Sequence, residues 1–195
     1  ILVASLVSTF GTNAIAANAV GNTIASFEVI PGSAIGLAMI TVVGQTLGAK
    51  QYDEARRYIK KLMKISYCSL AILNITILLS LNLILGFYRL TPEAFTMARQ
   101  IIIVHGVFCI FLWTPSFSLP NALRAGGDAK FIMLISIFSM WTFRIGFSYL
   151  LSLYFHLGLL GVWVAMLVDW LFRSIVFRLR FRTDKWIHHL SDDTL

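Results

Sequence analysis

Apolar residues follow one another along this chain in blocks of about 20, separated by short polar segments. A helix of that length spans about 30 Å, which matches the hydrocarbon layer of a membrane. Residues 1–10 form a block too short to cross, which we interpret as the tail of a truncated helix. We expect complete spans within residues 20–48, 62–87, 93–121, 130–155 and 158–180. The pattern thus predicts an all-α integral membrane protein, a polytopic bundle of about five complete helices plus the end of a sixth.

Proline and threonine mark where two of these helices bend or begin. Pro31 lies inside the first long segment and predicts a kink, since proline removes a backbone N–H. Thr91 followed by Pro92 predicts a helix start, with Thr91 as the N-cap. Between them, residues 50–64 have helical apolar spacing and many bases, which predicts an interfacial amphipathic turn that leads into the next span.

Glycine pairs at four-residue spacing predict close helix contacts. Gly32 and Gly36 form one pair, and Gly44 and Gly48 form another. Small side chains at this spacing let the backbones of two membrane helices approach each other. We expect both pairs to lie in tight helix packing.

The charges lie mainly between the apolar blocks. The chain is 58% hydrophobic with a mean hydropathy of +0.80 and only 13% charged residues, against roughly 25% in a soluble domain. The net charge of +7 does not indicate nucleic-acid binding, because the bases gather in loops as the positive-inside rule describes. The loop at 50–64, the loop at 124–130 and the C-terminus are therefore expected in the cytoplasm. The two cysteines lack the spacing of a disulfide or metal framework.

Three charged side chains lie deep in the apolar segments: Glu28, Arg144 and Asp169. A charge at that depth costs at least about 2.5–3.5 kcal/mol, so it is expected to pair or to line a polar path. Arg144 and Asp169 are equally far from a predicted turn near 156–157, and Arg173 follows Asp169 by one helical turn. We predict an Arg144–Asp169–Arg173 cluster, which either locks the last two helices together or serves as a charge relay or gate.

Glu28 has no base on its own span. It could exchange a proton or attract a cation from a wet cavity, or it could make a structural hydrogen bond to a neighbouring helix. His105 lies alone in a later span and is either a packed, hydrogen-bonded residue or a proton carrier. Asn18 and Asn22 make the first helices polar enough to line a cavity, so Glu28, Asn18 and Asn22 are the candidate contacts for substrate or coupling ion.

Four stretches together resemble the multidrug and toxic compound extrusion (MATE) family. They are Ile30–Lys50, Asp53-Glu-Ala-Arg-Arg57, Asn121-Ala-Leu-Arg-Ala-Gly-Gly-Asp-Ala-Lys130 and Gly161-Val-Trp-Val-Ala-Met-Leu-Val-Asp-Trp170 with Arg173. They occur in the family's order and spacing, over about residues 10–182. The resemblance implies one lobe of a twelve-helix, two-lobe transporter: residues 1–182 as the C-terminal transmembrane lobe, from the end of helix 7 to helix 12, and 183–195 as a cytoplasmic tail.

The resemblance also implies an activity. Family members expel cationic, amphipathic small molecules from the cell by alternating access, coupled to inward flow of H⁺ or Na⁺, with no cofactor. The partners would be those molecules, the lipid bilayer of the plasma membrane and a missing N-terminal lobe. Some family branches place an acid in helix 10, but the matching span here, about 98–120, has none. The coupling ion is therefore open, with Glu28 as a different acid in the same lobe.

Two other classes of function fit the sequence less well. A lipid-linked oligosaccharide flippase or polysaccharide exporter of related architecture would need a larger and more basic cavity, for which Arg144 is the one uncommitted buried base. An enzyme is disfavoured, because no Ser-His pair, phosphate loop or cluster of His, Asp and Glu is found near a membrane face.

Overall fold

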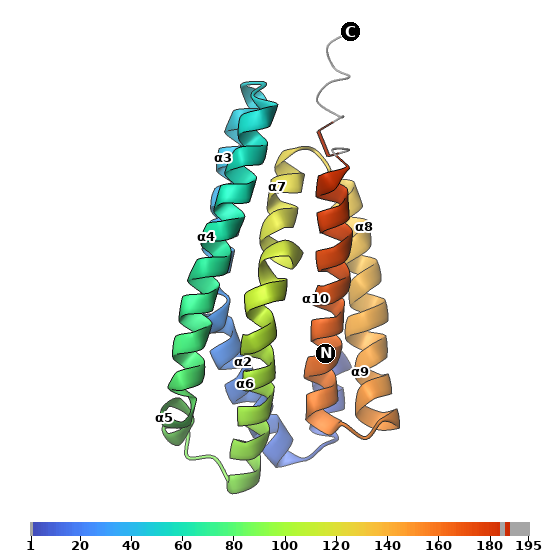
Figure 1. The fold of residues 1–195 in the computed structure, drawn as a ribbon. Helices are drawn as coiled ribbons and strands as arrows, with labels where there is room; N and C mark the ends of the chain where they lie inside the picture. The colour runs from blue at the N-terminus through green and yellow to red at the C-terminus, as the bar shows by residue number, and fades with distance from the viewer. Residues whose placement is uncertain (1, 184–185, 188–195) are drawn as a thin grey trace.

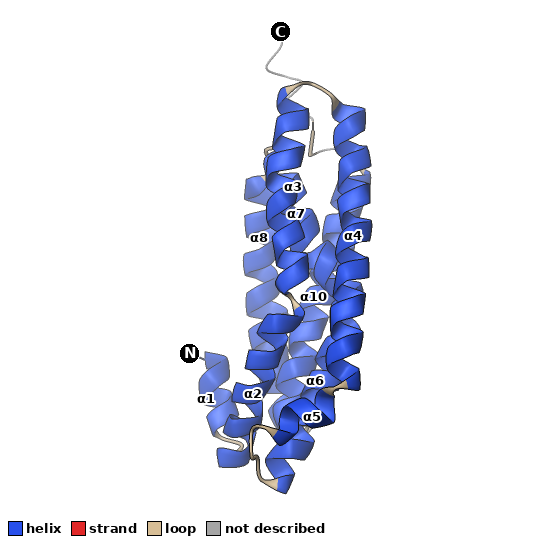
Figure 2. Ribbon diagram, turned by 90° about the vertical axis from the view of Figure 1, so that its left-hand side faces the viewer, coloured by secondary structure: helices blue, strands red, loops and turns tan. Residues whose placement is uncertain are grey.

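The computed structural model describes residues 2–183 and 186–187, and in this part of the chain the regular structure is helical throughout (Figure 2). The long helices run side by side as an elongated bundle (Figure 1). The first half contains α1 (Leu2–Ser8), α2 (Thr12–Glu28), α3 (Ile30–Gly48), α4 (Tyr52–Leu79) and α5 (Leu81–Gly86). The second half contains α6 (Pro92–Trp113), η1 (Thr114–Ser118), α7 (Leu119–Ala125), α8 (Ala129–Ser139), η2 (Met140–Gly146), α9 (Phe147–Tyr149), η3 (Leu150–Tyr154) and α10 (Gly158–Arg182).

Five of the described helical stretches are long and apolar enough to cross a membrane. They are Ile30–Gly48, Tyr52–Leu79, Pro92–Ala125, Ala129–Tyr154 and Gly158–Arg182. This confirms the expected helix bundle with about five spans. The predicted tail, 183–195, lies outside the described residues except for Thr183, Trp186 and Ile187.

The basic regions gather at one end of the bundle. The turn between α3 and α4, the turn between α7 and α8 and the end of α10 lie together at the top of Figure 1. The connection between α5 and α6, which carries Arg89, lies at the opposite end. The number and direction of the spans therefore bring the three basic segments to one side, as expected. Which side faces the cytoplasm stays a prediction.

The predicted kink lies between α2 and α3. Val29 separates the two helices, and Pro31 is in the first turn of α3. Pro31 has no N–H for the carbonyl of Phe27, which accepts instead from the Val29 N–H. The Asn74 side chain donates to the backbone carbonyl of Glu28 over 3.2 Å. A side chain of α4 thus satisfies a backbone group at the break, as helix breaks inside a membrane require.

The predicted helix start at Thr91 is confirmed. The Ala94 N–H donates to the Thr91 hydroxyl oxygen over 3.2 Å, and Pro92 is the first residue of α6. The Thr91 hydroxyl donates to the Asn13 side-chain oxygen over 2.8 Å, and the Asn13 amide donates to Glu93 over 2.5 Å. The cap therefore also ties the start of α6 to the start of α2. The last predicted turn is found as well, with His156 between η3 and α10.

The two glycine pairs have different environments. A Cβ on Gly32 would lie 2.4 Å from Cδ1 of Trp113, and one on Gly36 would lie 2.9 Å from Nδ2 of Asn121, so this pair packs as tightly as predicted. A Cβ on Gly44 or Gly48 would meet nothing within 4 Å. The prediction for the second pair was wrong, because that stretch of α3 turns these two positions away from its neighbours.

Buried polar groups lie between two apolar clusters. One cluster, with Ile24 and Ile101, fills the end of the bundle that contains α1 and α2. The other, with Met39 and Phe177, fills the opposite end. Between them along the helices lie the buried polar side chains Glu28, Ser66, Asn74, His105, Thr114, Ser116, Ser139 and Asp169. The outer surface is apolar, with exposed residues such as Leu37, Leu79 and Phe111, which suits contact with lipid.

Candidate functional site

A carboxylate and an imidazole meet in the middle of the bundle. Glu28 is the last residue of α2 and is 0% exposed, and His105 on α6 is 2% exposed. The Nδ1 atom of His105 contacts Oε2 of Glu28. Glu28 therefore has a titratable partner on another helix. A buried carboxylate in contact with a histidine can share a proton with the imidazole.

The second oxygen of Glu28 is unsatisfied. Its Oε1 atom is buried and has no hydrogen-bond partner among the described residues. A Cβ on Gly106 would lie 3.0 Å from this oxygen, so the glycine leaves room beside the carboxylate. The Asn74 side-chain oxygen is likewise buried without a partner. An unpaired buried acceptor is costly, and each of these two oxygens could be satisfied by a proton or a cation.

Two tryptophans of α10 lie against the ring of His105. Trp163 and Trp170 both meet it edge to face, with ring centroids 5.5 and 5.3 Å away. The indole N–H of Trp163 donates to the side-chain oxygen of Asn18 over 3.1 Å. Trp163 thus touches the imidazole of the buried pair with its ring and a residue of α2 with its N–H.

Trp163 also borders a cavity of about 200 Å³. Its polar lining is formed by Asn18, Asn22, Arg144 and Ser148, and Trp163 forms part of its wall. Asn18 and Asn22 line a cavity, as predicted. Glu28, which the sequence analysis grouped with them, is not part of this lining and lies with His105 instead.

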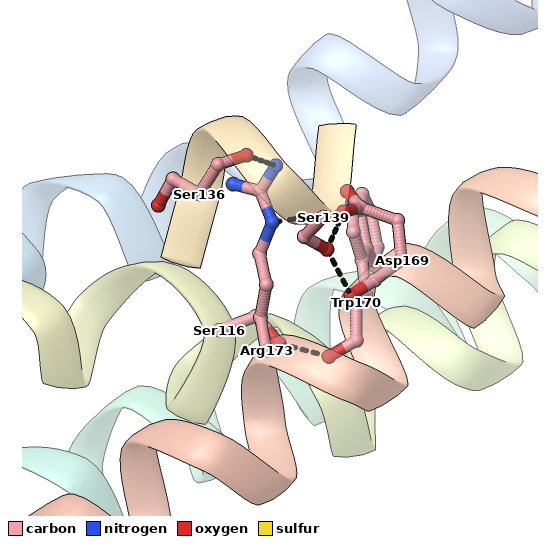
Figure 3. A network of polar contacts seen from close by, with 6 residues as sticks. All are labelled: Ser116, Ser136, Ser139, Asp169, Trp170 and Arg173. Atoms are coloured by element: carbon pink, nitrogen blue, oxygen red, sulfur yellow. Dashed lines mark hydrogen bonds and ion pairs between the residues drawn. The ribbon is translucent and has the colours of Figure 1, made fainter. Parts of the chain in front are cut away.

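Asp169 lies at the centre of a second polar network (Figure 3). It is 1% exposed, and its Oδ1 atom accepts from Nε of Arg173 over 3.0 Å and from the Ser139 hydroxyl. Arg173 also donates to the carbonyl oxygen of Ser136 over 3.3 Å. The neighbouring Trp170 carbonyl accepts from Ser116 over 2.6 Å. The network joins α10 to α8 and to η1, which is the locking role that the sequence suggested for Asp169 and Arg173.

Arg144 makes no hydrogen bond with this network, so the predicted cluster is only partly formed: Arg144 lies close enough for the charges of Asp169 and Arg173 to act on it, without a direct contact. No ion pair joins Arg144 to Asp169 in the described structure; Arg144 lines the cavity beside Asn18 and Asn22. The cause is local: residues Met140–Gly146 form a π-helix. A π-turn bonds residue i to i+5 and holds more residues than an α-turn, so later side chains point to a different face from the one that α-helical periodicity predicts. Ser139, just before the π-helix, takes the place at Asp169.

A further cavity of about 320 Å³ lies beside the Asp169 network. Its lining includes Asn121, Arg124 and Arg173, with Trp113 and Phe117 as aromatic walls. No pattern in the sequence predicted this cavity or the contact between Glu28 and His105. The one available signal for the contact was that both are isolated polar groups within apolar segments. No group of three or more metal-ligating side chains occurs among the described residues.

Comparison with known proteins gives a consistent result. The MatE family model matches residues 1–150. A probable multidrug resistance protein NorM of Thermotoga maritima is 27% identical over 95% of this chain and 40% of its own length. A probable multidrug resistance protein YoeA of Bacillus subtilis is 29% identical over 84% of this chain and 35% of its own length. The chain therefore spans about 40% of the length of the curated relatives it matches.

The fold is also that of a solved structure. A crystal structure of MATE in complex with MaL6 superposes with a TM-score of 0.81 at 20% identity. The match covers 98% of this chain and 43% of that one.

Proposed function

The chain belongs to the MatE family, whose members are transporters and not enzymes, and from this we propose that it forms one lobe of a multidrug efflux transporter. The complete protein would expel cationic, amphipathic small molecules across the plasma membrane by alternating access, coupled to inward flow of H⁺ or Na⁺. The relatives named as multidrug resistance proteins support the substrate class. A second lobe, as the greater length of the relatives suggests, would provide the other half of the substrate path.

The buried pair of Glu28 and His105 carries the proposal for coupling. Glu28 ends α2 directly before the helix break, and such breaks are where carriers commonly place their ion sites. Protonation of Glu28 would change its bond to His105 and the charge at the junction of α2 and α3. Because Asn74 of α4 donates to the backbone carbonyl of Glu28, this change would be felt on α2, α4 and α6 together.

The contact with an imidazole favours H⁺ as the coupling ion. A carboxylate and an imidazole nitrogen in contact can pass a proton between them, whereas Na⁺ needs several oxygen ligands around it. The unpartnered oxygens of Glu28 and Asn74 are the groups that a Na⁺ ion would use. We therefore propose H⁺ as the coupling ion, and the experiment also tests Na⁺.

Asn18, Asn22 and Trp163 are the candidate substrate contacts in this lobe. The two amides offer oxygens to a cation, and the indole offers a ring face or edge to a flat molecule. Trp163 also contacts His105, so a substrate bound against the indole would lie close to the proposed proton site and could affect it through this ring.

The proposal is tested by efflux of ethidium from cells that carry the complete transporter. The wild type is compared with Glu28→Gln, and the proton and sodium gradients are collapsed separately. Glutamine keeps the shape of the side chain and an oxygen that can accept from His105, so the protein should reach the membrane normally. Glu93→Gln is the matched control, because this acid is exposed at the end of the bundle.

We expect Glu28→Gln to lose gradient-driven efflux and Glu93→Gln to retain it, with the wild type sensitive to the proton gradient. Normal efflux by Glu28→Gln would show that Glu28 is structural. Sensitivity to the sodium gradient alone would replace H⁺ by Na⁺. A well-expressed wild type that exports no cation would contradict the multidrug assignment and favour a lipid-linked substrate, to which Arg144 in the cavity would be suited.

A further inference from the structure

Basic side chains from two helices converge on one groove at the end of the bundle. The groove has a volume of about 450 Å³, and we call it the basic groove. Lys60 and Met63 of α4 line one side, Arg178, Phe181 and Arg182 of α10 line the other, and Leu119 of α7 lies at its floor. Arg56 completes the lining. In Figure 1, α7 separates α4 from α10 at this end, in agreement with that lining.

Helical spacing explains why these residues meet. Lys60 and Met63 are three residues apart, as are Arg178 and Phe181, and Arg182 follows Arg178 by four. Each set therefore occupies one face of its helix. Arg178 also donates to the Tyr67 hydroxyl over 2.6 Å, which fixes its guanidinium beside α4.

Three of the four bases that line the groove have no acidic partner among the described residues. None of the lining residues is acidic, and Lys60, Arg178 and Arg182 make no ion pair with a described residue. Arg180, which lies between the two arginines in sequence, is bound by both oxygens of Asp128 at 2.6 and 3.0 Å. Arg180 thus has an acidic partner, whereas Arg178 and Arg182 line the groove.

We propose that the basic groove binds the phosphate-bearing headgroup of an anionic phospholipid. The volume suits a small ligand, and arginine and lysine are the side chains that bind phosphate oxygens. A lipid fits better than free phosphate, because Leu171 and Ile175 are exposed on the same face of α10 as Arg178. Acyl chains would lie along these two residues while the headgroup lies among the bases.

The site goes beyond the proposed transport activity and does not depend on it. It uses none of the residues that we assign to coupling or to substrate. Its effect would be to hold the ends of α4 and α10 at a fixed separation in a membrane that contains anionic lipid. The bases of such a site would bind one headgroup together. This binding would be stronger than the general attraction of a basic loop for an anionic surface, and would add to it.

The test measures lipid binding to the complete, detergent-purified protein by native mass spectrometry. Phosphatidylglycerol is the probe, with phosphatidylcholine as the neutral lipid and glycerol 1-phosphate as the soluble source of the same headgroup. The groove variant combines Lys60→Gln, Arg178→Gln and Arg182→Gln. The control variant combines Arg57→Gln, Lys61→Gln and Lys64→Gln, which removes the same charge from exposed positions of α4 outside the groove.

Each base near an anionic headgroup contributes about fivefold in affinity, so the groove variant should bind phosphatidylglycerol about a hundredfold more weakly than the wild type. The control variant should bind within about tenfold of the wild type. Equal losses in the two variants would mean diffuse surface attraction and would overturn the site, as would no loss in either. Glycerol 1-phosphate bound as tightly as the lipid would overturn the assignment to lipid.

A charge-preserving variant guards against loss through misfolding. Lys60→Arg with Arg178→Lys and Arg182→Lys keeps all three positive charges, so it should retain lipid binding to within about tenfold. If this variant loses binding as fully as the glutamine variant while both keep the wild-type melting temperature, attraction by charge is not the basis of the site.

Discussion

Adding one methyl group at Gly32 should destabilise the lobe, because this glycine lies directly against an indole ring that is packed in an aromatic cluster. The new Cβ would lie 2.4 Å from Cδ1 and 2.6 Å from Nε1 of Trp113. The Trp113 ring is stacked on Phe117 at 4.1 Å between centroids and lies edge to face with Trp170 at 5.2 Å. The methyl group must therefore push α3 away from α6 or displace three aromatic rings together.

The magnitude follows from two opposing effects. Overpacking costs about 1–3 kcal/mol, and the very close approach of the new Cβ to the Trp113 ring places Gly32→Ala near the upper end. Alanine favours the helix over glycine by up to about 1 kcal/mol. The free energy of unfolding should therefore fall by about 2 kcal/mol. Gly44→Ala is the matched control on the same helix: its Cβ meets nothing within 4 Å, so only the gain of up to about 1 kcal/mol remains.

The assay is thermal unfolding of the complete protein in detergent, followed by size-exclusion chromatography of a fluorescent fusion. Gly32→Ala should melt below the wild type, and Gly44→Ala at or above it. Combining Gly32→Ala with Trp113→Leu, which removes the ring, should bring the melting temperature closer to that of Trp113→Leu alone. Equal melting temperatures for Gly32→Ala and Gly44→Ala would refute the reasoning, because the close contact at Gly32 would then have no effect on stability.

Three further substitutions separate the roles of the remaining polar residues. Arg173→Ala should reduce the yield of folded protein, at a cost of about 3–5 kcal/mol, because Asp169 would keep only Ser139 as a side-chain partner; adding Asp169→Asn should recover part of the yield, and no recovery would disprove a charge effect. Arg144→Ala should instead express like the wild type and change ethidium efflux, since Arg144 lines the cavity; reduced expression would restore the predicted pairing with Asp169. Thr91→Ala should lower the free energy of unfolding by about 1 kcal/mol in a thermal melt, and an unchanged melt would mean that Pro92 alone sets the start of α6.

Local signals in the sequence were sufficient for the outline of the bundle. Apolar blocks predicted the spans, Pro31 predicted the break after Glu28, and Thr91 with Pro92 predicted the start of α6. Each of these features depends on residues of a single helix or of the turn beside it. The geometry of proline and the length of the apolar block determine these features, and packing between helices is not needed for them.

The site depends on contacts between helices that are not consecutive, and these could not be predicted. Glu28 and His105 are 77 residues apart, and α3, α4 and α5 lie between their helices in the sequence. The depth rule that related Arg144 to Asp169 applies only to neighbouring spans, and even there it assumes an unbroken α-helix. The π-helix at Met140–Gly146 changed the face on which Arg144 lies, and no proline or glycine pair announces it.

The two indoles that flank His105 give the protein an optical property. An imidazole that gains a proton quenches the emission of a tryptophan in contact with it, and Trp163 and Trp170 are both in such contact. Under the proposed coupling, a change in the charge of His105 would therefore change the intrinsic fluorescence of the unlabelled protein. The difference between the emission of the wild type and that of His105→Asn, recorded while a gradient is applied, would show the proton arriving in real time.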